Sequence, residues 1–317
     1  SLLEHKMVVD TIPPAVRAVS RMHNVNLGGA CLVVYQTSSD TMESGVFVDD
    51  HFFKGFPAGG IAEEGLHVCY IGLPYFAEKD PEIYLWAQDR AGNHSRAGFY
   101  YHVRKERFRS ERITLTDRFF SRVLPYFAVP SEPGSSLEKF LVVNRQVREE
   151  NNRTLAALKD RSSPEQLWHG TWLRLKNAAP MAKYADHRTY YYKGKEVDEQ
   201  VHLGVDLASL ANSEVQAANR GSVTYAGSLG IYGLTVVLDH GQGLASIYGH
   251  LSRIDVELGQ EVMKGQVIGL TGQTGLAGGD HLHFGVMAGG VFVNPIEWWD
   301  SHWIQDNITR KLAMIRE

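Results

Sequence analysis

The segment HLHFGV, residues 281–286, constrains the fold of this chain more than any other short stretch. In a β-strand, successive side chains point to opposite faces of the sheet. The two histidines and Gly285 would then share one face. The other face would be apolar and would consist of Leu282, Phe284 and Val286. We therefore predict a strand that packs its apolar face on a core and turns two imidazoles toward a groove.

A second pair of candidate metal ligands lies far upstream, in the segment HLGVDLAS at residues 202–209. His202 and Asp206 have the spacing that would place both on one face of a helix. Gly204 and the β-branched Val205 disfavour a regular helix, so we predict a bent strand or loop. Gly204 would also permit a close approach of the backbone to a neighbouring group. Imidazole and carboxylate are both good zinc ligands.

The composition is that of an ordinary globular chain with enough apolar residues for two domains. Of 317 residues, 44% are hydrophobic. The 32 basic and 36 acidic side chains give a net charge of −4, which argues against a broad nucleic-acid-binding face. We find no apolar run long enough to span a membrane and no apolar secretory core in SLLEHKMVVD. A removed signal or membrane anchor stays compatible with this sequence.

The two cysteines, Cys31 and Cys69, both lie in β-like stretches of the first hundred residues. A disulfide between them would fit an extracytoplasmic protein. Two buried free thiols fit equally well, because a buried cysteine behaves as a small hydrophobe. Neither lies near the histidine-rich part, so neither is predicted as a metal ligand.

Residues 1–104 are predicted to form an N-terminal antiparallel β-sandwich, because short strands rich in β-branched and aromatic residues alternate with turn signals. The predicted strands are 30–36, 44–50, 67–73, 82–89 and 98–104. The stretch DRAGN, after YLWAQ, resembles the strand-turn-strand end of bacterial immunoglobulin-like domains. That resemblance implies an immunoglobulin-like β domain.

Residues 105–165 are more highly charged and are predicted to form a helical linker of one or two helices. Ser135 followed by Glu138 is a capping-box pattern. An apolar stripe at helical spacing follows, formed by Leu137, Phe140, Leu141 and Val147. The charged run RQVREENNR is interpreted as a solvated helix face.

Residues 166–300 are predicted to form a second, mainly antiparallel β domain. Segments 234–240 and 244–251, joined by GQG, form a clear hairpin candidate. After Pro295 the sequence turns helical, and residues 301–317 are predicted as a C-terminal helix. The tryptophans of this region are Trp298, Trp299 and Trp303. We predict that they pack against the sheet, with sugar stacking as the less favoured alternative.

The second domain holds a cluster of histidines, namely His202, His240, His250, His281 and His283. Three protein ligands plus one water make up a catalytic zinc site. His202, Asp206 and one of the two HLH histidines would complete such a site. Zinc would lower the pKa of a bound water toward about 7 and polarise a carbonyl. A peptide hydrolase also needs a base and an oxyanion donor, for which the other HLH histidine and His250 are available. His240 lies at a turn and is predicted to be structural.

The segments HLGVDLAS, IYGHLS and GDHLHFGV occur in the order and approximate spacing of the lysostaphin/LytM-type zinc metallopeptidases, which residues 195–297 resemble. The resemblance implies an antiparallel β-sheet domain of the duplicated-hybrid-motif type with an open groove. The ligands it implies for one Zn²⁺ per chain are His202, Asp206 and His283. It also implies that His250 and His281 are catalytic. All five positions are filled, unlike in degenerate members that act only as activators.

Some members of this family use a tyrosine upstream of the first ligand to assist the oxyanion. RTYYYKGK offers Tyr190, Tyr191 and Tyr192, and the sequence does not choose among them. For any one of them, packing on the sheet is the simpler interpretation.

The resemblance implies a zinc metalloendopeptidase that cleaves peptide bonds in peptidoglycan stem peptides or cross-links, in the periplasm or exposed on the cell envelope. One of the two catalytic histidines would act as base and the other would support the developing negative charge. The N-terminal domain is predicted to be a spacer, with partner binding or covering of the groove as alternatives. A second hypothesis is a catalytically silent envelope module that binds peptidoglycan or activates another hydrolase. A third is a structural zinc, whose chelation would unfold the domain.

Overall fold

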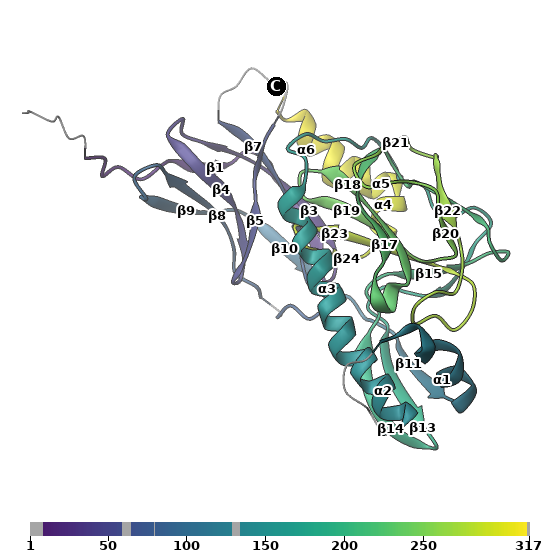
Figure 1. Ribbon diagram of the computed structural model, residues 1–317. Helices are drawn as coiled ribbons and strands as arrows, with labels where there is room; N and C mark the ends of the chain where they lie inside the picture. The colour runs from purple at the N-terminus through teal and green to yellow at the C-terminus, as the bar shows by residue number, and fades with distance from the viewer. Residues whose placement is uncertain (1–8, 59–64, 79, 129–133, 316–317) are drawn as a thin grey trace, which may run out of the picture.

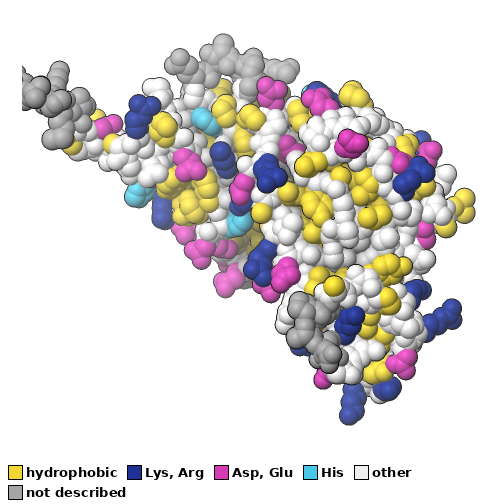
Figure 2. Space-filling view, in the orientation of Figure 1, with side chains coloured by type: hydrophobic (Ala, Val, Ile, Leu, Met, Phe, Trp, Pro, Cys, Tyr) yellow, Lys and Arg dark blue, Asp and Glu magenta, His cyan; other side chains and the backbone are white. Residues whose placement is uncertain are grey.

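The computed structural model describes residues 9–58, 65–78, 80–128 and 134–315. Figure 1 shows an N-terminal group of strands, a long diagonal helix and a larger C-terminal β part. The fold is mainly β, as predicted. Among the described residues, no helix is both long and apolar enough to cross a membrane. Figure 2 shows basic and acidic side chains intermixed on the face it draws, without a broad basic patch.

Two four-stranded antiparallel sheets pack face to face in the N-terminal part and share a core. The first has the order β1-β3-β7-β6, with β1 Val16–Ala18, β3 Ala30–Thr37, β7 Leu66–Gly72 and β6 Phe56–Pro57. The second has the order β5-β4-β8-β9, with β5 His51–Lys54, β4 Thr41–Val48, β8 Ile83–Asp89 and β9 His94–Gly98. The predicted sandwich is present, and the immunoglobulin-like assignment stays a prediction.

One strand predicted in the sandwich is divided in the structure. The segment 98–104 was expected as a single strand, but β9 ends at Gly98 and a separate strand, β10 (Tyr101–Arg104), begins after it. β10 leaves the sheet and pairs in parallel with β2 (His23–Asn26). Alternation of residue types cannot distinguish one long strand from two strands that pair with different partners.

The first sheet is packed against the second domain as well as against its own partner sheet. On β3, Cys31 and Val33 point into the sandwich core, whereas Leu32 and Val34 belong to the core of the C-terminal part. The buried Lys311 donates a hydrogen bond from Nζ to the Leu32 carbonyl (2.9 Å). Both Cys31 and Cys69 are buried free thiols, which is the second of the two alternatives weighed for them.

The linker contains a strand in addition to the predicted helices. β11 (Ser110–Leu115) pairs in parallel with β13 (His187–Tyr192), and α1 (Asp117–Val123) follows it, with the 3₁₀ turn η1 at Leu124–Tyr126. A continuous helical rod comes next, made of α2 (Ser136–Val142), the π-helical η2 (Val143–Val147), α3 (Arg148–Ala157) and the 3₁₀ turn η3 (Leu158–Arg161). Ser135 and Glu138 form the predicted capping box. Phe140 of the predicted stripe is fully buried.

An eight-stranded antiparallel sheet forms the framework of the C-terminal part. Its order is β12-β15-β23-β19-β18-β17-β21, with β24 paired to β23. The bounds are β12 Ala179–Ala182, β15 Val205–Ala208, β17 Gly221–Ser228, β18 Leu234–Gly241, β19 Leu244–Leu251, β21 Glu261–Val262, β23 Leu282–Ala288 and β24 Val291–Val293. β18 and β19 form the predicted hairpin. β23 contains most of HLHFGV.

Smaller elements complete this part. β14 (Lys195–Val201) pairs with β13, and a three-stranded sheet contains β16 (Glu214–Gln216), β22 (Val267–Leu270) and β20 (Arg253–Ile254). The turn η4 spans Gly230–Tyr232. The C-terminal helical segments are α4 (Ile296–Trp299), α5 (Ser301–Ile304), η5 (Gln305–Thr309) and α6 (Arg310–Ala313).

The tryptophans near the C-terminus pack as predicted. Trp298 is fully buried, and its ring centroid lies 5.4 Å from that of Trp168 and 4.9 Å from that of Trp172. Trp299 stacks on Phe284 of β23. The division of the chain into 1–104, 105–165, 166–300 and 301–317 stays a prediction.

Candidate metal and catalytic centre

The register of two neighbouring strands and a bend before one of them bring the predicted ligands together. On β15 and β23, Asp206 and His283 are direct cross-strand partners, so their side chains share one face of the sheet. His202 lies just after the end of β14, on a bend that continues into β15. Gly204 is needed in this bend, because a Cβ there would lie 2.5 Å from Cε1 of His283. The sequence prediction of a bent segment with close backbone approach is confirmed.

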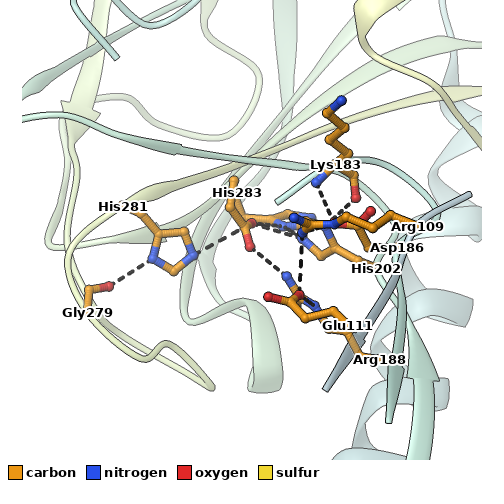
Figure 3. Close-up of polar contacts among 10 residues, drawn as sticks. Arg109, Glu111, Lys183, Asp186, Arg188, His202, Gly279, His281 and His283 are labelled. Atoms are coloured by element: carbon orange, nitrogen blue, oxygen red, sulfur yellow. Dashed lines mark hydrogen bonds and ion pairs between the residues drawn. The ribbon is translucent and has the colours of Figure 1, made fainter. Parts of the chain in front are cut away.

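Three potential ligand atoms converge at this point. His202 Nε2 lies 2.9 Å from Asp206 Oδ1 and 3.0 Å from His283 Nδ1, and the last two atoms lie 2.9 Å apart. All three residues are buried. In Figure 3 the imidazoles of His202 and His283 lie close together, and His281 stands to one side. The three residues form one group that could hold a metal ion.

The hydrogen-bonding pattern of this group suits a cation. The carbonyl of Lys183 lies 2.9 Å from His202 Nδ1 and accepts a hydrogen bond from it, which leaves a lone pair on Nε2. Burial lowers the pKa of His283 to about 4, so its imidazole is neutral at pH 7. Burial alone would raise the pKa of Asp206, but the facing His202 and His283 hold it well below its usual range. Two imidazole nitrogens and a carboxylate oxygen are among the ligand types that bind zinc in proteins.

The two predicted catalytic histidines lie beside the group without belonging to it. The ring centroids of His250 and His281 are 4.7 Å apart, and the centroid of His250 is 5.9 Å from that of His283. The Nδ1 atom of each is held by a backbone carbonyl, Thr274 for His250 and Gly279 for His281, at 2.8 Å in both cases. This contact leaves an Nε2 lone pair on each ring. His281 Nε2 lies 3.6 Å from Asp206 Oδ1.

His250 is held in an unusual state. Its φ of 62° lies in the left-handed region, which a non-glycine residue seldom adopts. Burial, together with the neighbouring His281 and His283, lowers the pKa of His250 well below its ordinary value. At pH 7 this imidazole is neutral, and its Nε2 lone pair can accept a hydrogen bond.

Tyr232 is a groove residue that sequence reasoning did not identify. Its ring centroid lies 5.3 Å from that of His283. Helix α3 holds the turn that carries it: Asn152 Oδ1 accepts from the Tyr232 hydroxyl (2.8 Å), and Asn151 Oδ1 accepts from Ile231 N (2.8 Å). No motif in the sequence marks this contact, because it joins two segments that are far apart in the chain.

Arg188 is a second residue that the sequence did not reveal. Its Nη2 donates to Asp206 Oδ2 (3.0 Å), the carboxylate oxygen that faces away from the histidines, and its Nε lies 3.5 Å from Glu111 Oε2. Figure 3 shows these two residues adjacent to the cluster. Glu111 belongs to the linker strand β11, so the linker contributes directly to the environment of the predicted ligands.

The three candidate tyrosines lie on one strand, β13, but their side chains have different surroundings. Tyr190 is buried and lines the groove, with its ring against Phe140. Tyr191 and Tyr192 donate instead to Glu196 and Asp117 at the exposed surface. Tyr190 is therefore the one of the three that faces the site, and a catalytic role for it stays a prediction.

His240 has the structural position that was predicted for it. Its Nδ1 lies 2.7 Å from the Arg220 carbonyl and its Nε2 lies 2.7 Å from Ser246 Oγ. Trp172 packs against its ring at 4.3 Å between centroids. The residue is fully buried away from the groove.

The candidate site lies at the bottom of a groove of about 340 Å³. Besides the histidines and Asp206, its walls include residues of the linker, namely Glu111, Ile113, Phe119, Phe140 and Arg148. Of the described part of residues 1–104, no residue lines this groove. The linker, which the sequence suggested was a connection, forms one of the groove walls.

Replacing Arg188 with glutamine should weaken zinc binding by about 10–100-fold, because partners that orient a ligating group commonly contribute that much affinity. The change removes the donor to Asp206 and leaves Arg109 as the ion-pair partner of Glu111. Competition with a chromophoric chelator would measure the zinc affinity. The matched control is Arg112→Gln on the adjacent strand, whose exposed guanidinium stacks on Tyr191. Equal zinc affinities in the two variants would contradict this role of Arg188.

Comparisons with known proteins show what this domain is similar to. Residues 200–295 match the family model described as Peptidase family M23. The DD-carboxypeptidase/endopeptidase Mpg of Neisseria meningitidis is 37% identical over 97 residues, which cover 31% of this chain and 22% of that protein. The Murein hydrolase activator EnvC of Escherichia coli is 38% identical over 95 residues, covering 30% of this chain and 23% of that protein. The chain thus spans about a fifth of the length of these relatives.

One solved structure matches most of the chain. It comes from Pseudomonas aeruginosa and is described as a candidate peptidase M23. The match covers 86% of this chain and 94% of that chain, with a TM-score of 0.52 and 21% identity. At this identity the likeness concerns the fold alone, and it includes the N-terminal part and the linker as well as the matched domain.

Proposed function

Because residues 200–295 match the peptidase M23 family model, we propose that this chain is a zinc-dependent endopeptidase that hydrolyses peptide bonds in peptidoglycan stem peptides or cross-links. The observation that carries the proposal is the convergence of His202 Nε2, Asp206 Oδ1 and His283 Nδ1 at the bottom of an open groove. A groove of this kind can accept an extended peptide.

The roles of the residues follow from their atoms. His202, Asp206 and His283 would hold the zinc ion, which acidifies water and polarises the scissile carbonyl when bound. His250 and His281 each direct an Nε2 lone pair away from the carbonyl that fixes Nδ1. One of them would take the proton of the attacking water and pass it to the amine nitrogen that leaves when the C–N bond breaks, and the other, in its protonated form, would donate a hydrogen bond to the developing oxyanion.

The relatives support the substrate class and the location. Mpg is described as a DD-carboxypeptidase/endopeptidase and EnvC as a murein hydrolase activator. Because peptidoglycan lies outside the cytoplasmic membrane, we assign this chain to the periplasm or to the exposed cell envelope.

A catalytically silent role is the second candidate, favoured by the 38% identity to an activator. Such a module would bind peptidoglycan or a hydrolase through the same groove without cleaving a bond. The complete set of two catalytic histidines and three candidate ligands in this chain favours hydrolysis instead.

Incubation of purified peptidoglycan with the zinc-loaded protein should release separated stem peptides that mass spectrometry of muropeptides identifies. The masses of the products name the bond that is cleaved. The same protein treated with a chelator and then resupplied with zinc provides the control. An unchanged muropeptide profile over a range of pH, salt and zinc concentrations would instead assign the chain to the silent class.

A further inference from the structure

Arg148 is a basic residue in the groove that the proposed chemistry does not use. It is the first residue of α3 and lines the same groove as His250, His281 and Tyr232. Burial raises the pKa of the Tyr232 hydroxyl, and the positive charge of Arg148 acts in the opposite direction. A cation therefore lines the same groove as the ring that packs on His283.

The guanidinium of Arg148 is oriented by two hydrogen bonds to Asn144. Its Nε donates to the Asn144 carbonyl (3.0 Å) and its Nη2 to Asn144 Oδ1 (2.6 Å). Asn144 is fully buried in the π-helical turn η2, and its Nδ2 donates to Asp198 Oδ2 (2.8 Å). The arginine is thus positioned by a buried amide that is itself anchored to β14.

Arg148 differs from the other charged residues of the groove. Glu111 and Asp206 pair with Arg188, and Asp280 accepts from Asn212 N. Among the described residues, no carboxylate oxygen lies within ion-pair distance of Arg148, and its two hydrogen bonds to Asn144 leave three of its five N–H donors unused. An oriented cation with spare donors in a substrate groove is suited to binding a carboxylate in a paired geometry.

We propose that Arg148 determines specificity by binding a carboxylate of the peptide that occupies the groove. The inference rests on the proposed function and names a feature of its substrate: a free carboxylate near the bond that is cleaved. Two sources offer this chemistry, the C-terminal α-carboxylate of a stem peptide and the side-chain carboxylate of its diamino acid. Neutral or amidated peptides lack the group and would leave Arg148 without a partner.

The test compares three synthetic cross-linked stem peptides with the zinc-loaded chain. The first has both carboxylates free, the second has an amidated C-terminus, and the third has an amidated side-chain carboxylate. We expect one of the two amides to lower kcat/KM by about 10–100-fold in the wild-type protein, since a hydrogen bond to a charged group is worth about that factor. The amidated peptide with the lower kcat/KM identifies which carboxylate Arg148 binds.

The variants isolate the arginine. In Arg148→Gln the kcat/KM preference for the free carboxylate over the amide should fall to about threefold or less. Arg148→Lys keeps the charge but loses the planar guanidinium, so its preference should be intermediate between those of the wild-type protein and Arg148→Gln. Arg153→Gln removes a charge from the exposed part of the same helix and should keep the full preference. If Arg148→Gln lowers kcat/KM equally for the free acid and for both amides, the role of Arg148 is merely structural and the inference is overturned. A wild-type protein with the same kcat/KM on all three peptides would also overturn it.

Failure of the proposed function can be told apart from failure of this inference. Isothermal titration calorimetry with single, uncleavable stem tetrapeptides measures the same preference as a ratio of Kd values. If no peptide is cleaved, a carboxylate preference that depends on Arg148 still upholds the inference. If peptides are cleaved and neither Kd nor kcat/KM depends on the carboxylate, the inference fails and the hydrolase stands.

Discussion

Replacing His283 with alanine should reduce bound zinc from one ion per chain to nearly none and lower peptidoglycan hydrolysis by about a thousandfold or more. His283 Nδ1 lies within 3.0 Å of both other candidate ligand atoms, so its loss leaves only two ligands. Elemental analysis gives the zinc content, and muropeptide release gives the activity. His302→Ala is the matched control, because this histidine is exposed on the C-terminal helix.

Removal of the metal should leave the fold of the wild-type protein largely intact. Asp206 and His283 lie on strands of an eight-stranded sheet that has its own apolar core, and His202 lies on the bend that leads into β15, so the sheet does not depend on the ion for its packing. Chelation should therefore abolish activity while the circular dichroism spectrum persists. Unfolding on chelation would identify a structural zinc, and zinc retained by the His283→Ala protein would remove this residue from the ligand set.

Replacing His250 or His281 with alanine should lower kcat by about 10²–10⁴-fold while about one zinc per chain remains bound. Both side chains lie beside the cluster, and both direct Nε2 away from a backbone carbonyl. Because the two would act in one step, the double variant should be little worse than either single variant. Steady-state rates on a synthetic cross-linked peptide and zinc content measured on the same samples provide the two readouts.

The histidine variants also have an informative control within the domain. His240 is buried between the Arg220 carbonyl and Ser246, away from the groove, so His240→Gln should lower thermal stability and leave kcat of the folded protein unchanged. Loss of zinc from His281→Ala would mean that this imidazole is a ligand, and an unchanged kcat in either alanine variant would contradict its assignment as a proton-transfer group.

The linker has a larger part in this protein than its sequence suggests. Its strand β11 brings Glu111 to Arg188, and its helical rod brings Asn151 and Asn152 to the turn that carries Tyr232. Residues 105–165 lie outside the matched family model, which begins at residue 200. Differences in substrate between related chains would therefore be expected to arise in this wall of the groove.

Local patterns predicted much of the secondary structure correctly because the relevant forces act over a few residues. Alternation in HLHFGV placed His283 on one face of a strand and Phe284 on the other, and β23 has that arrangement. The capping pattern at Ser135 and the hairpin of β18 and β19 formed as expected. Where a segment changed partners, as between β9 and β10, the same patterns were insufficient.

The sequence by itself determined which chemistry we propose for the chain, because the identity and order of His202, Asp206, His250, His281 and His283 restrict the candidate metal ligands and the candidate proton-transfer groups. Tertiary structure alone decided what surrounds them. The partners Arg188 and Tyr232, and the wall residue Arg148, come from segments far from the motifs. Their contacts depend on long-range packing of a helix and two strands, and no local periodicity encodes which distant surfaces meet.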